Sequence, residues 1–449
     1  MRKIITLFLA MMFTLSTASA ESLHKTLSSL DVNKSAVAIY IKDVNSGNVV
    51  FSMNEKAPML PASTLKLVTS SAAVDMLGAD YKYKTQLYKS TNNDLYLKLS
   101  ADPMLDSSDI DKLIETANAK NIVPKNFYID DTVFDKTEWG EGWQWDDNLN
   151  PLMPKFSSYN INKNLLKVEV IPTVQGASAK FLVKPFYPLT FMNLVTTDAT
   201  VPTDISIASD NSIAPNMLNV SGTVSKLTNL IIPVPNPRMN FILRLQNSIN
   251  SKKMEYFGAI KNAKLPNQNI YMVEEIEHPI EDMIPMILKN SNNFVAETLF
   301  KSAGALWAKS QGSNRNSLAM LSAYLDKIRL NSDNIKIVDG SGVSKNNIMT
   351  AEFMGDFLEY KSKTDDFDTF KDLLPTAGEG TLKNRMLYFK DNLRAKTGTL
   401  ADTSAIAGYI TSRKGRMYAF DIMINDAKTS AADKKNIEEQ ILRNLYANY

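Results

Sequence analysis

The residues whose types and spacing are best suited to chemistry are Ser63 and Lys66, in the stretch Pro61-Ala62-Ser63-Thr64-Leu65-Lys66. If Ser63 opens a helix, Lys66 lies one turn further along the same face, and its amine reaches the serine hydroxyl. The positive helix N-terminus and burial both disfavour the ammonium form of lysine. A neutral lysine accepts the serine proton, so the pair is a candidate nucleophile and base.

The Ser-x-x-Lys pattern is weak by itself, because it also occurs at Ser22…Lys25. Ser22 lies next to a predicted cleavage site, in a segment expected to fray, and is the poorer candidate. Apolar residues at helical spacing, followed by a glycine, support a helix after Ser63: Leu65, Val68, Ala72, Met76 and Gly78.

Cysteine and histidine usage narrows the chemistry further. The chain has no cysteine, which excludes thiol nucleophiles and thiolate metal sites. Its only histidines are His24 and His278, so a zinc-binding H-x-x-x-H helix is excluded. A Ser-His-Asp triad would have to use one of these two residues. We therefore expect a serine hydrolase that uses lysine as its base and needs neither a metal nor a cofactor.

A second motif, Lys396-Thr397-Gly398, is the only Lys-[Ser/Thr]-Gly in the chain. It lies on a predicted strand, 393–400, where Lys396 and Gly398 face one side and Thr397 the other. The glycine lets a substrate backbone approach, and a hydroxyl with an ammonium can hold a carboxylate. The alternative is an ordinary edge strand with an exposed lysine.

Ser-x-Asn is far less specific, because it matches nine times and twice spells Ser-Asp-Asn, at Ser209 and Ser332. We choose Ser291 with Asn293, because they lie in a connection between two predicted helices, where a hydroxyl and an amide can project into a cleft. The order S-x-x-K, S-x-N, K-T-G is that of penicillin-binding proteins and β-lactamases.

The hydrophobic pattern predicts a mixed α and β chain. Predicted strands cover 35–42, 49–52, 94–99, 126–129, 166–171, 203–207, 241–245, 393–400, 404–411 and 417–424. Predicted helices cover 108–120, 294–304, 317–330 and a C-terminal segment whose apolar stripe should pack on the last three strands: Ile437, Ile441, Leu442 and Leu445.

The N-terminus is typical of a secretory signal peptide, with Arg2 and Lys3, an apolar core and a small-residue site at Ala18-Ser19-Ala20. Removing residues 1–20 leaves 48 basic and 48 acidic residues, a balance that does not suggest nucleic acid. No later apolar run is long enough to span a bilayer. We expect a periplasmic protein, soluble or peripherally membrane-associated.

Taken together, the motifs resemble the penicillin-binding protein 4 type of D-alanyl-D-alanine carboxypeptidase/endopeptidase, peptidase family S13. The resemblance covers most of the mature chain. Besides the motifs above it includes Asp339-Gly340-Ser341-Gly342, 374–382 and Ala296-Glu297. It implies an α+β fold with a β-lactamase/transpeptidase-like catalytic domain, an antiparallel sheet flanked by helices, from residues 21–88 and 275–449. Residues 89–274 would form a β-rich inserted domain or a nested pair of domains.

The resemblance also implies roles for individual residues. Ser63 would be the acylated nucleophile and Lys66 its base, while Ser291 and Asn293 would relay the proton and hold the substrate amide. Lys396 and Thr397 would bind the terminal carboxylate next to Gly398, and the backbone N–H groups of Ser63 and Thr399 would form the oxyanion hole. Peptidoglycan stem peptides would be the substrate and β-lactam antibiotics covalent inhibitors.

Two further positions are expected to contact substrate. Where the family commonly has Leu-Ser-Arg, this chain has Val343-Ser344-Lys345, which keeps the charge but not a bidentate grip on a carboxylate. Asp147 ends a tryptophan-rich stretch, 138–147, and would read a basic side chain of the stem peptide, with Asp146 as the alternative. The tryptophans themselves suit either a satellite core or a substrate-facing wall.

A β-lactamase and a catalytically idle peptidoglycan-binding protein are the rival interpretations. The chain lacks the Glu-x-x-Leu-Asn of class A β-lactamases, and its one Tyr-x-Asn, at Tyr446, lies beyond the Lys-Thr-Gly. We therefore expect slow release of a bound β-lactam.

Overall fold

The computed structural model describes residues 23–209 and 216–449. The predicted signal peptide, Ser22 and two residues of the Ser209-Asp210-Asn211 match lie outside the described residues. The chain divides into two compact units. The described part of the first unit comprises 23–79, 281–307 and 314–449, and that of the second comprises 80–209, 216–280 and 308–313. The insert borders expected from the sequence, 88/89 and 274/275, remain predictions.

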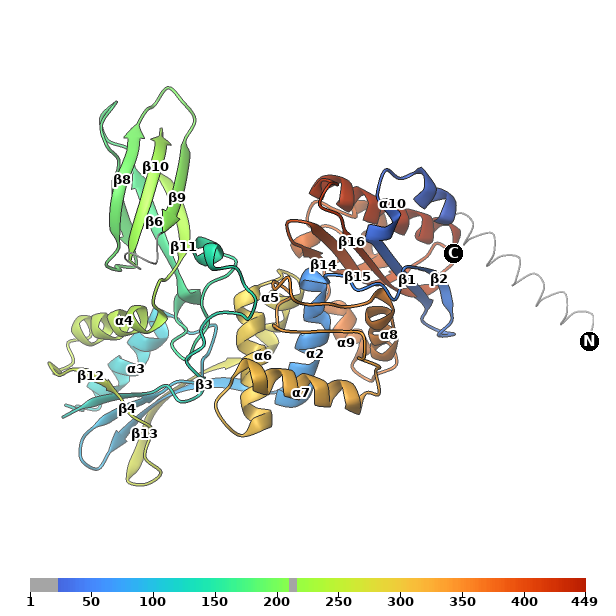
Figure 1. Cartoon of the computed structure of the whole chain (residues 1–449). Coiled ribbons are helices and arrows are strands. Elements are labelled where there is room, and N and C mark those ends of the chain that lie inside the picture. Colours follow the sequence, from blue (N-terminus) through green and yellow to red (C-terminus); the bar gives the residue numbers. More distant parts are fainter. Residues whose placement is uncertain (1–22, 210–215) are drawn as a thin grey trace, which may run out of the picture. The chain divides into compact units, whose positions relative to one another are not determined.

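The first unit is built on a five-stranded antiparallel sheet with the order β14-β15-β16-β1-β2 (Figure 1). The strands are β1 (Val37–Asp43), β2 (Val49–Met53), β14 (Leu393–Thr399), β15 (Thr403–Thr411) and β16 (Met417–Asn425). Strands from the two ends of the chain are therefore neighbours, because β1 pairs with β16. β14 is an edge strand, so one side of its backbone is free to meet another chain.

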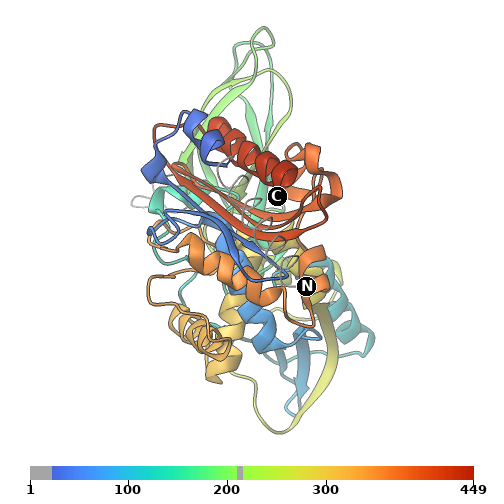
Figure 2. The ribbon, with the colours of Figure 1, turned by 90° about the vertical axis from the view of Figure 1, so that its right-hand side faces the viewer.

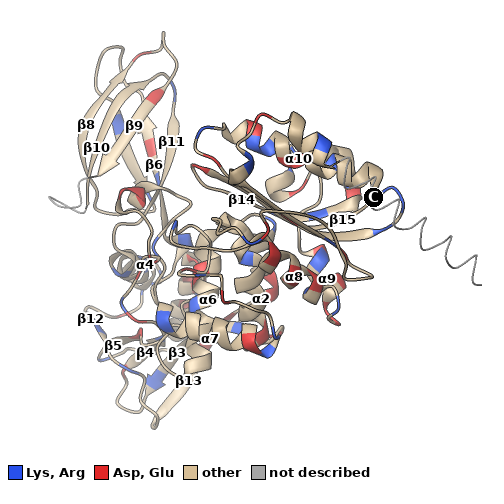
Figure 3. Ribbon diagram, turned by 45° about the vertical axis from the view of Figure 1, so that its right-hand side comes forward, with Lys and Arg blue, Asp and Glu red and all other residues tan. Residues whose placement is uncertain are grey.

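Helix α10 (Ala431–Asn448) covers one face of this sheet (Figure 2). Its Ile437, Ile441, Leu442 and Leu445 are buried against sheet residues such as Phe420, which confirms the predicted packing. The helix also carries residues of both charge signs (Figure 3). The helix is thus an amphipathic cover of the sheet.

The opposite face of the sheet carries α8 (Ala351–Lys361). Gly355 makes this close packing possible, since a Cβ atom there would lie 2.4 Å from the Tyr40 ring. The other helices of the unit are α2 (Lys66–Leu77), α5 (Ile284–Leu288), α6 (Asn293–Ala308), α7 (Asn314–Lys327) and α9 (Phe367–Asp372). Helix α2 contacts both α5 and α7, so it belongs to the helical layer of the unit.

The second unit contains a mixed five-stranded sheet and a β-sandwich. The sheet has the order β12-β5-β4-β3-β13, and helices α3 (Ser107–Ala119) and α4 (Pro237–Ser251) pack on it. Its strands are β3 (Lys82–Ser90), β4 (Leu95–Lys98), β5 (Phe127–Asp130), β12 (Ile260–Asn262) and β13 (Ile270–Pro279).

Two three-stranded sheets, β8-β10-β9 and β11-β6-β7, enclose the core of the sandwich. Their strands are β6 (Leu165–Ile171), β7 (Lys180–Lys184), β8 (Thr190–Thr197), β9 (Asp204–Ser209), β10 (Met217–Val224) and β11 (Thr228–Pro233). Alternate residues of these strands face inward, as expected for packed sheets.

The strand predicted for 241–245 is wrong, because these residues lie inside α4. Asn236 caps the helix by accepting the N–H of Met239, and Pro237 occupies its first position. Phe241, Leu245 and Ile249 then recur every four residues and pack on the five-stranded sheet. Four of the five residues at 241–245 are apolar, and so short an apolar run does not distinguish strand from helix.

No helix in the described ranges is both long and apolar enough to cross a membrane. Within the same ranges, no group of His, Cys, Asp and Glu side chains is placed to hold a metal ion.

One buried carboxyl group in the sheet lowers the free energy of unfolding by an amount that depends on pH. Asp421 on β16 is fully buried between Tyr40 and Ala407 of the neighbouring strands. Neither of its carboxyl oxygens has a hydrogen-bond partner in the described part of the chain. Burial, together with the nearby Glu438, raises the pKa of Asp421 well above its usual range.

Replacing this group should therefore stabilise the fold at high pH. The folded chain retains a proton on Asp421 that the unfolded chain releases above about pH 4, so the folded state loses stability as pH rises. Asp421→Asn removes this titration. We expect its gain in the free energy of unfolding to be larger at pH 8 than at pH 5, by about 1.4 kcal/mol or more, measured by urea denaturation.

The exposed Asp333 provides the control. Asp333→Asn should change the free energy of unfolding equally at both pH values. A gain for Asp421→Asn that is the same at pH 5 and pH 8 would contradict the assignment.

Candidate active site

Ser63 lies in a short 3₁₀ turn, Ala62–Leu65, that leads directly into α2, and Lys66 is the first residue of that helix. The expectation that Ser63 opens a helix therefore holds only in this modified form. Because side chains three residues apart are eclipsed in a 3₁₀ turn, Lys66 lies directly above Ser63. Ala62 has a φ of +47°, a conformation that non-glycine residues rarely adopt, so the backbone before Ser63 is strained.

The amine of Lys66 is shared by three oxygen atoms from three segments. Its Nζ lies 2.8 Å from Ser63 Oγ, 2.7 Å from Asn293 Oδ1 and 2.5 Å from the carbonyl oxygen of Ser341. A neutral amine has two N–H bonds and one lone pair. If the N–H bonds are donated to Asn293 and Ser341, the lone pair points at the Ser63 hydroxyl, as general-base catalysis requires.

Burial brings the pKa of Lys66 close to neutrality. The side chain is fully buried, and desolvation lowers its pKa to about 7, although the carboxyl groups of Asp339 and Glu297 act in the opposite direction. At neutral pH a large fraction of Lys66 is therefore an uncharged base. Ser63 itself is only half-buried, so that a substrate can reach its hydroxyl.

The second lysine, Lys396, is also fully buried and contacts the chosen Ser-x-Asn motif. Its Nζ donates to Ser291 Oγ at 2.8 Å and to the carbonyl oxygen of Thr397 at 2.6 Å. Desolvation, followed by repulsion from Lys66, lowers the pKa of Lys396 well below its ordinary value. Ser291 has a φ of +60°, so this residue too is held in a strained conformation beside the site.

The open edge of β14 directs backbone donors away from the sheet. Leu400 and Thr403 bond each other at the end of the β14–β15 ladder, whereas Ala395 donates its N–H outward to Pro375. Since N–H groups alternate along an antiparallel strand, those of Thr397 and Thr399 also point away from β15. The predicted oxyanion donor at Thr399 is therefore available on the free edge.

Gly398 allows this edge to lie against the 3₁₀ turn that carries Ser63. A Cβ atom at Gly398 would be 2.9 Å from the backbone N of Ser63 and 2.9 Å from the carbonyl oxygen of Pro61. Any larger residue would push β14 away from the 3₁₀ turn. The glycine of the Lys-Thr-Gly motif is thus required by chain packing, in addition to the close approach of a substrate.

Thr381 is a neighbour of this edge to which we assigned no role from the sequence. Its hydroxyl accepts a hydrogen bond from Thr397 Oγ1 at 2.7 Å, and its backbone N–H donates to the carbonyl oxygen of Lys289. The Gly-Thr-Leu at 380–382 within the resemblance was the only available signal. Two hydroxyl groups therefore lie together beside β14.

Glu297 and Asp339 also received no role from the sequence, although both belong to stretches on which the resemblance rests. Both are buried, and both accept hydrogen bonds from backbone N–H groups of the turn at 340–344. Glu297 lies one helical turn after Asn293, a spacing that places the two on the same face of α6. That spacing could have indicated that Glu297 is close to the site.

The remaining predicted residues, Lys345 and Asp147, are not brought to Ser63 by the contacts within either unit. Lys345 is exposed and pairs with Asp402 at 3.6 Å, in the loop that follows β14. Asp147 lies in the second unit, in a 3₁₀ turn, Trp145–Leu149. Trp143 is buried there against Trp139 and Phe156, so it belongs to a satellite core.

Trp145, two residues from Asp147, is 80% exposed. The tryptophan-rich stretch is thus partly core and partly surface, and Asp147 lies on its surface part.

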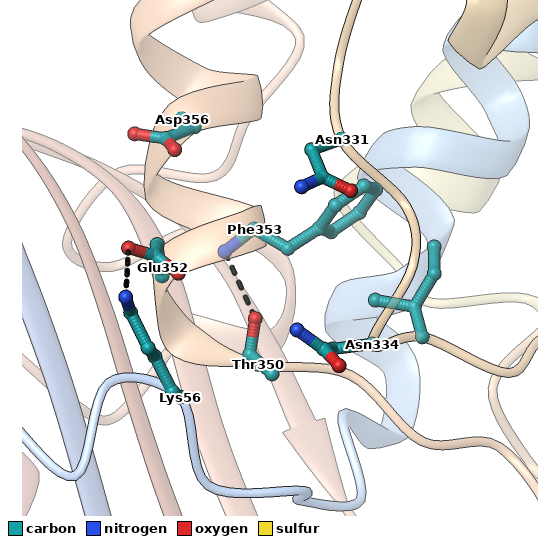
Figure 4. A pocket seen from close by; sticks show the side chains of 8 residues that line it. Lys56, Asn331, Asn334, Thr350, Glu352, Phe353 and Asp356 are labelled. Carbon is teal, nitrogen blue, oxygen red and sulfur yellow. Dashed lines mark hydrogen bonds and ion pairs between the residues drawn. The ribbon is translucent and has the colours of Figure 1, made fainter.

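A polar pocket of about 260 Å³ lies elsewhere in the first unit (Figure 4). Glu352 and Asp356 of α8 line one wall, and Lys56 pairs with Glu352 at 3.7 Å. Asn331 and Asn334 reach it from a loop. None of the motif residues lines this pocket, so it does not contribute to the candidate site.

The closest packing at the site gives a test. Gly342 has a φ of +78°, and a Cβ atom there would lie 1.9 Å from the carbonyl oxygen of Ala62. Gly342→Ala should therefore displace the 3₁₀ turn and lower the free energy of unfolding by about 2 kcal/mol or more, measured in urea.

Gly176 is the matched control, because its φ is +77° and nothing lies within 4 Å of an added Cβ. Gly176→Ala includes the cost of the positive φ without the clash. Equal losses in the two variants would show that Gly342 is not in close contact with the 3₁₀ turn that carries Ser63.

Comparisons with known proteins agree with this geometry. A model of the D-Ala-D-Ala carboxypeptidase 3 (S13) family matches residues 19–448. D-alanyl-D-alanine carboxypeptidase DacB of Haemophilus influenzae is 25% identical over 438 residues, which span 92% of this chain and 90% of that protein.

Solved structures show the same fold. The crystal structure of penicillin binding protein 4 (dacB) from Haemophilus influenzae has a TM-score of 0.81 at 24% identity, over 91% of this chain and 95% of that one. Its complex with a novel beta-lactam has a TM-score of 0.79 at 22% identity, over 95% and 99%. These matches confirm the predicted α+β fold and the resemblance stated from the motifs. The chain therefore belongs to the S13 family of serine-type D-Ala-D-Ala carboxypeptidases, which are hydrolases.

Proposed function

We propose that this protein removes or cleaves at D-alanine in peptidoglycan stem peptides, through an acyl-enzyme on Ser63. It would act as a D-Ala-D-Ala carboxypeptidase, as a D,D-endopeptidase on cross-links, or as both. The observation that carries the proposal is the buried Lys66 amine, 2.8 Å from Ser63 Oγ and with its pKa lowered to about 7. The predicted signal peptide at 1–20 supports a site of action in the periplasm.

Acylation begins with attack of Ser63 Oγ on the carbonyl carbon of the penultimate D-Ala. The hydroxyl proton passes to Lys66 Nζ as the new C–O bond forms. The N–H groups of Ser63 and Thr399 stabilise the negative charge that develops on the carbonyl oxygen. The C–N bond then breaks, and the leaving amine takes the proton from Lys66 by way of Ser291.

The terminal carboxylate of the substrate would bind beside Lys396 and Thr397, with the exposed Lys345 as a further cation. Burial and the nearby Lys66 lower the pKa of Lys396 and so disfavour its ammonium form. The negative charge of an arriving carboxylate would stabilise that ammonium again. Asn293 would hold the substrate amide. Water then hydrolyses the ester and releases Ser63.

A β-lactam would enter the same cycle. Its amide nitrogen stays tethered after the ring opens, so it cannot diffuse away as D-alanine does. The complex of penicillin binding protein 4 from Haemophilus influenzae with a beta-lactam supports this proposal for a chain of the same fold. The missing β-lactamase motifs favour a long-lived adduct over rapid hydrolysis.

Covalent labelling tests the central step. Intact-mass measurement after penicillin treatment should find one adduct per chain, and Ser63→Ala should abolish it. Lys66→Ala should slow adduct formation by at least ~100-fold, because the hydroxyl then lacks its general base.

Each rival predicts a different result. Rapid release of the adduct would indicate a β-lactamase, and no adduct on the folded wild type would indicate an idle binding protein. An adduct that persists in Ser63→Ala would remove Ser63 as the nucleophile. Mass analysis of purified muropeptides would then distinguish loss of D-alanine from cleavage of a cross-link.

Asp147 gives a second test, of substrate choice. If it reads a basic stem-peptide side chain, Asp147→Asn should reduce kcat/KM on a diamino-acid stem peptide by about tenfold, or ~1.4 kcal/mol. Penicillin has no such side chain, so the rate of penicillin labelling should change little.

The neighbouring Asp146, which is exposed, is the alternative candidate for this contact and is tested in parallel. Asp146→Asn should leave both substrates unaffected. Equal losses on penicillin and on the peptide in Asp147→Asn would indicate a folding defect, and unchanged kinetics would exclude Asp147 from substrate recognition.

A further inference from the structure

Glu297 has contacts that connect it to the catalytic lysine without touching the reacting atoms. It lies on α6, is 4% exposed, and its carboxyl oxygens receive two adjacent backbone N–H groups. Oε1 lies 3.0 Å from the N of Gly340 and 2.8 Å from the N of Ser341, and Oε2 lies 3.1 Å from the N of Gly340. These two peptides form the middle of the Asp-Gly-Ser-Gly turn.

The rest of that turn is held from other sides. Asp339 receives the N–H groups of Gly342 and Ser344 at 2.9 and 2.7 Å. Thr69 of α2 donates its hydroxyl hydrogen to the carbonyl oxygen of Gly340 at 2.7 Å. The next carbonyl oxygen, that of Ser341, accepts the 2.5 Å hydrogen bond from Lys66.

We propose that Glu297 is a positioning residue for Lys66, acting through the turn. By holding the N–H groups of Gly340 and Ser341, it fixes the carbonyl oxygen of Ser341 that orients the Lys66 amine. With Asn293 as the second acceptor on that amine, the lone pair is directed at Ser63. Its kinetic consequences rest on the proposed function, whereas its structural consequences do not.

The charges around Glu297 are consistent with this role. Burial, and then Asp339, raise the pKa of Glu297 to about 8, while Lys66 lowers it. Lys301, one turn further along α6, is also buried, and Lys66 lies close enough to Lys396 to lower the pKa of Lys396. Burying a carboxyl group costs free energy unless hydrogen bonds compensate for the lost water. For Glu297 those bonds come from the N–H groups of Gly340 and Ser341.

Three variants distinguish the loss of the hydrogen-bond acceptor at Glu297 from the loss of its charge and from a general loss of stability. Glu297→Ala removes the acceptor, whereas Glu297→Gln keeps an oxygen acceptor for both N–H groups without the charge. Leu299→Ala creates a cavity on the same helix at a residue that is 1% exposed, and it should lower stability without altering the turn.

The first measurement is hydrogen exchange of the Gly340 and Ser341 amides. In Glu297→Ala their protection should fall by at least ~100-fold relative to α6, while Glu297→Gln and Leu299→Ala should keep it. Unchanged protection in Glu297→Ala would overturn the proposal. This readout does not need catalysis, so it stands even if wild-type protein forms no penicillin adduct and the proposed function fails.

The second measurement is the rate of penicillin acylation as a function of pH. Glu297→Ala should lose about 100-fold, the cost expected for a misplaced catalytic group, and Glu297→Gln should stay within about tenfold of wild type. Removing a carboxylate cannot raise the pKa of Lys66. The acylation rate of Glu297→Gln should therefore begin to rise with pH at the same pH as in the wild type, or at a lower one. A loss in Glu297→Gln as large as in Glu297→Ala, or a rising limb at higher pH, would overturn the role.

Discussion

The site depends on one constraint, the burial of the Lys66 amine among oxygen atoms that belong to other segments. A lysine in water is an ammonium ion at neutral pH and a poor base. Here desolvation lowers its pKa to about 7. Ser63, Asn293 and Ser341 supply its hydrogen-bond partners. Burial without those partners would leave an unsatisfied polar group, and the partners without burial would leave a cation.

Close backbone packing brings those partners together. The turn at 339–342 lies directly on the 3₁₀ turn, because Gly342 has no Cβ to strike the carbonyl oxygen of Ala62. On the other side Gly398 lets β14 lie against the N of Ser63. Two glycines from distant parts of the chain therefore allow two backbones to meet at Ser63, and the strained φ of Ala62 is the local cost.

The edge position of β14 and the second buried lysine complete the arrangement. An edge strand presents outward N–H groups, which are a liability in most proteins and would be a binding surface under the proposed function. Lys396 connects that edge to Ser291, and its pKa is lowered for the same reason as that of Lys66. The two lysines thus share one desolvated environment, in which a bound carboxylate would restore a charge to Lys396.

The sequence by itself determined the chemistry, because Ser63, Lys66 and Lys396-Thr397-Gly398 are local patterns and the chain offers no cysteine and only two histidines. It also determined the sheet of the last three strands and the face of α10, since their periodicity is long and regular. Segment 241–245 was misassigned because a five-residue apolar run does not distinguish strand from helix. Only the tertiary structure decided which Ser-x-Asn match meets Lys66 and Lys396, and that Glu297 and Asp339 hold the turn beneath Lys66. Those contacts join residues far apart in the chain, and their geometry follows from packing that no local pattern encodes.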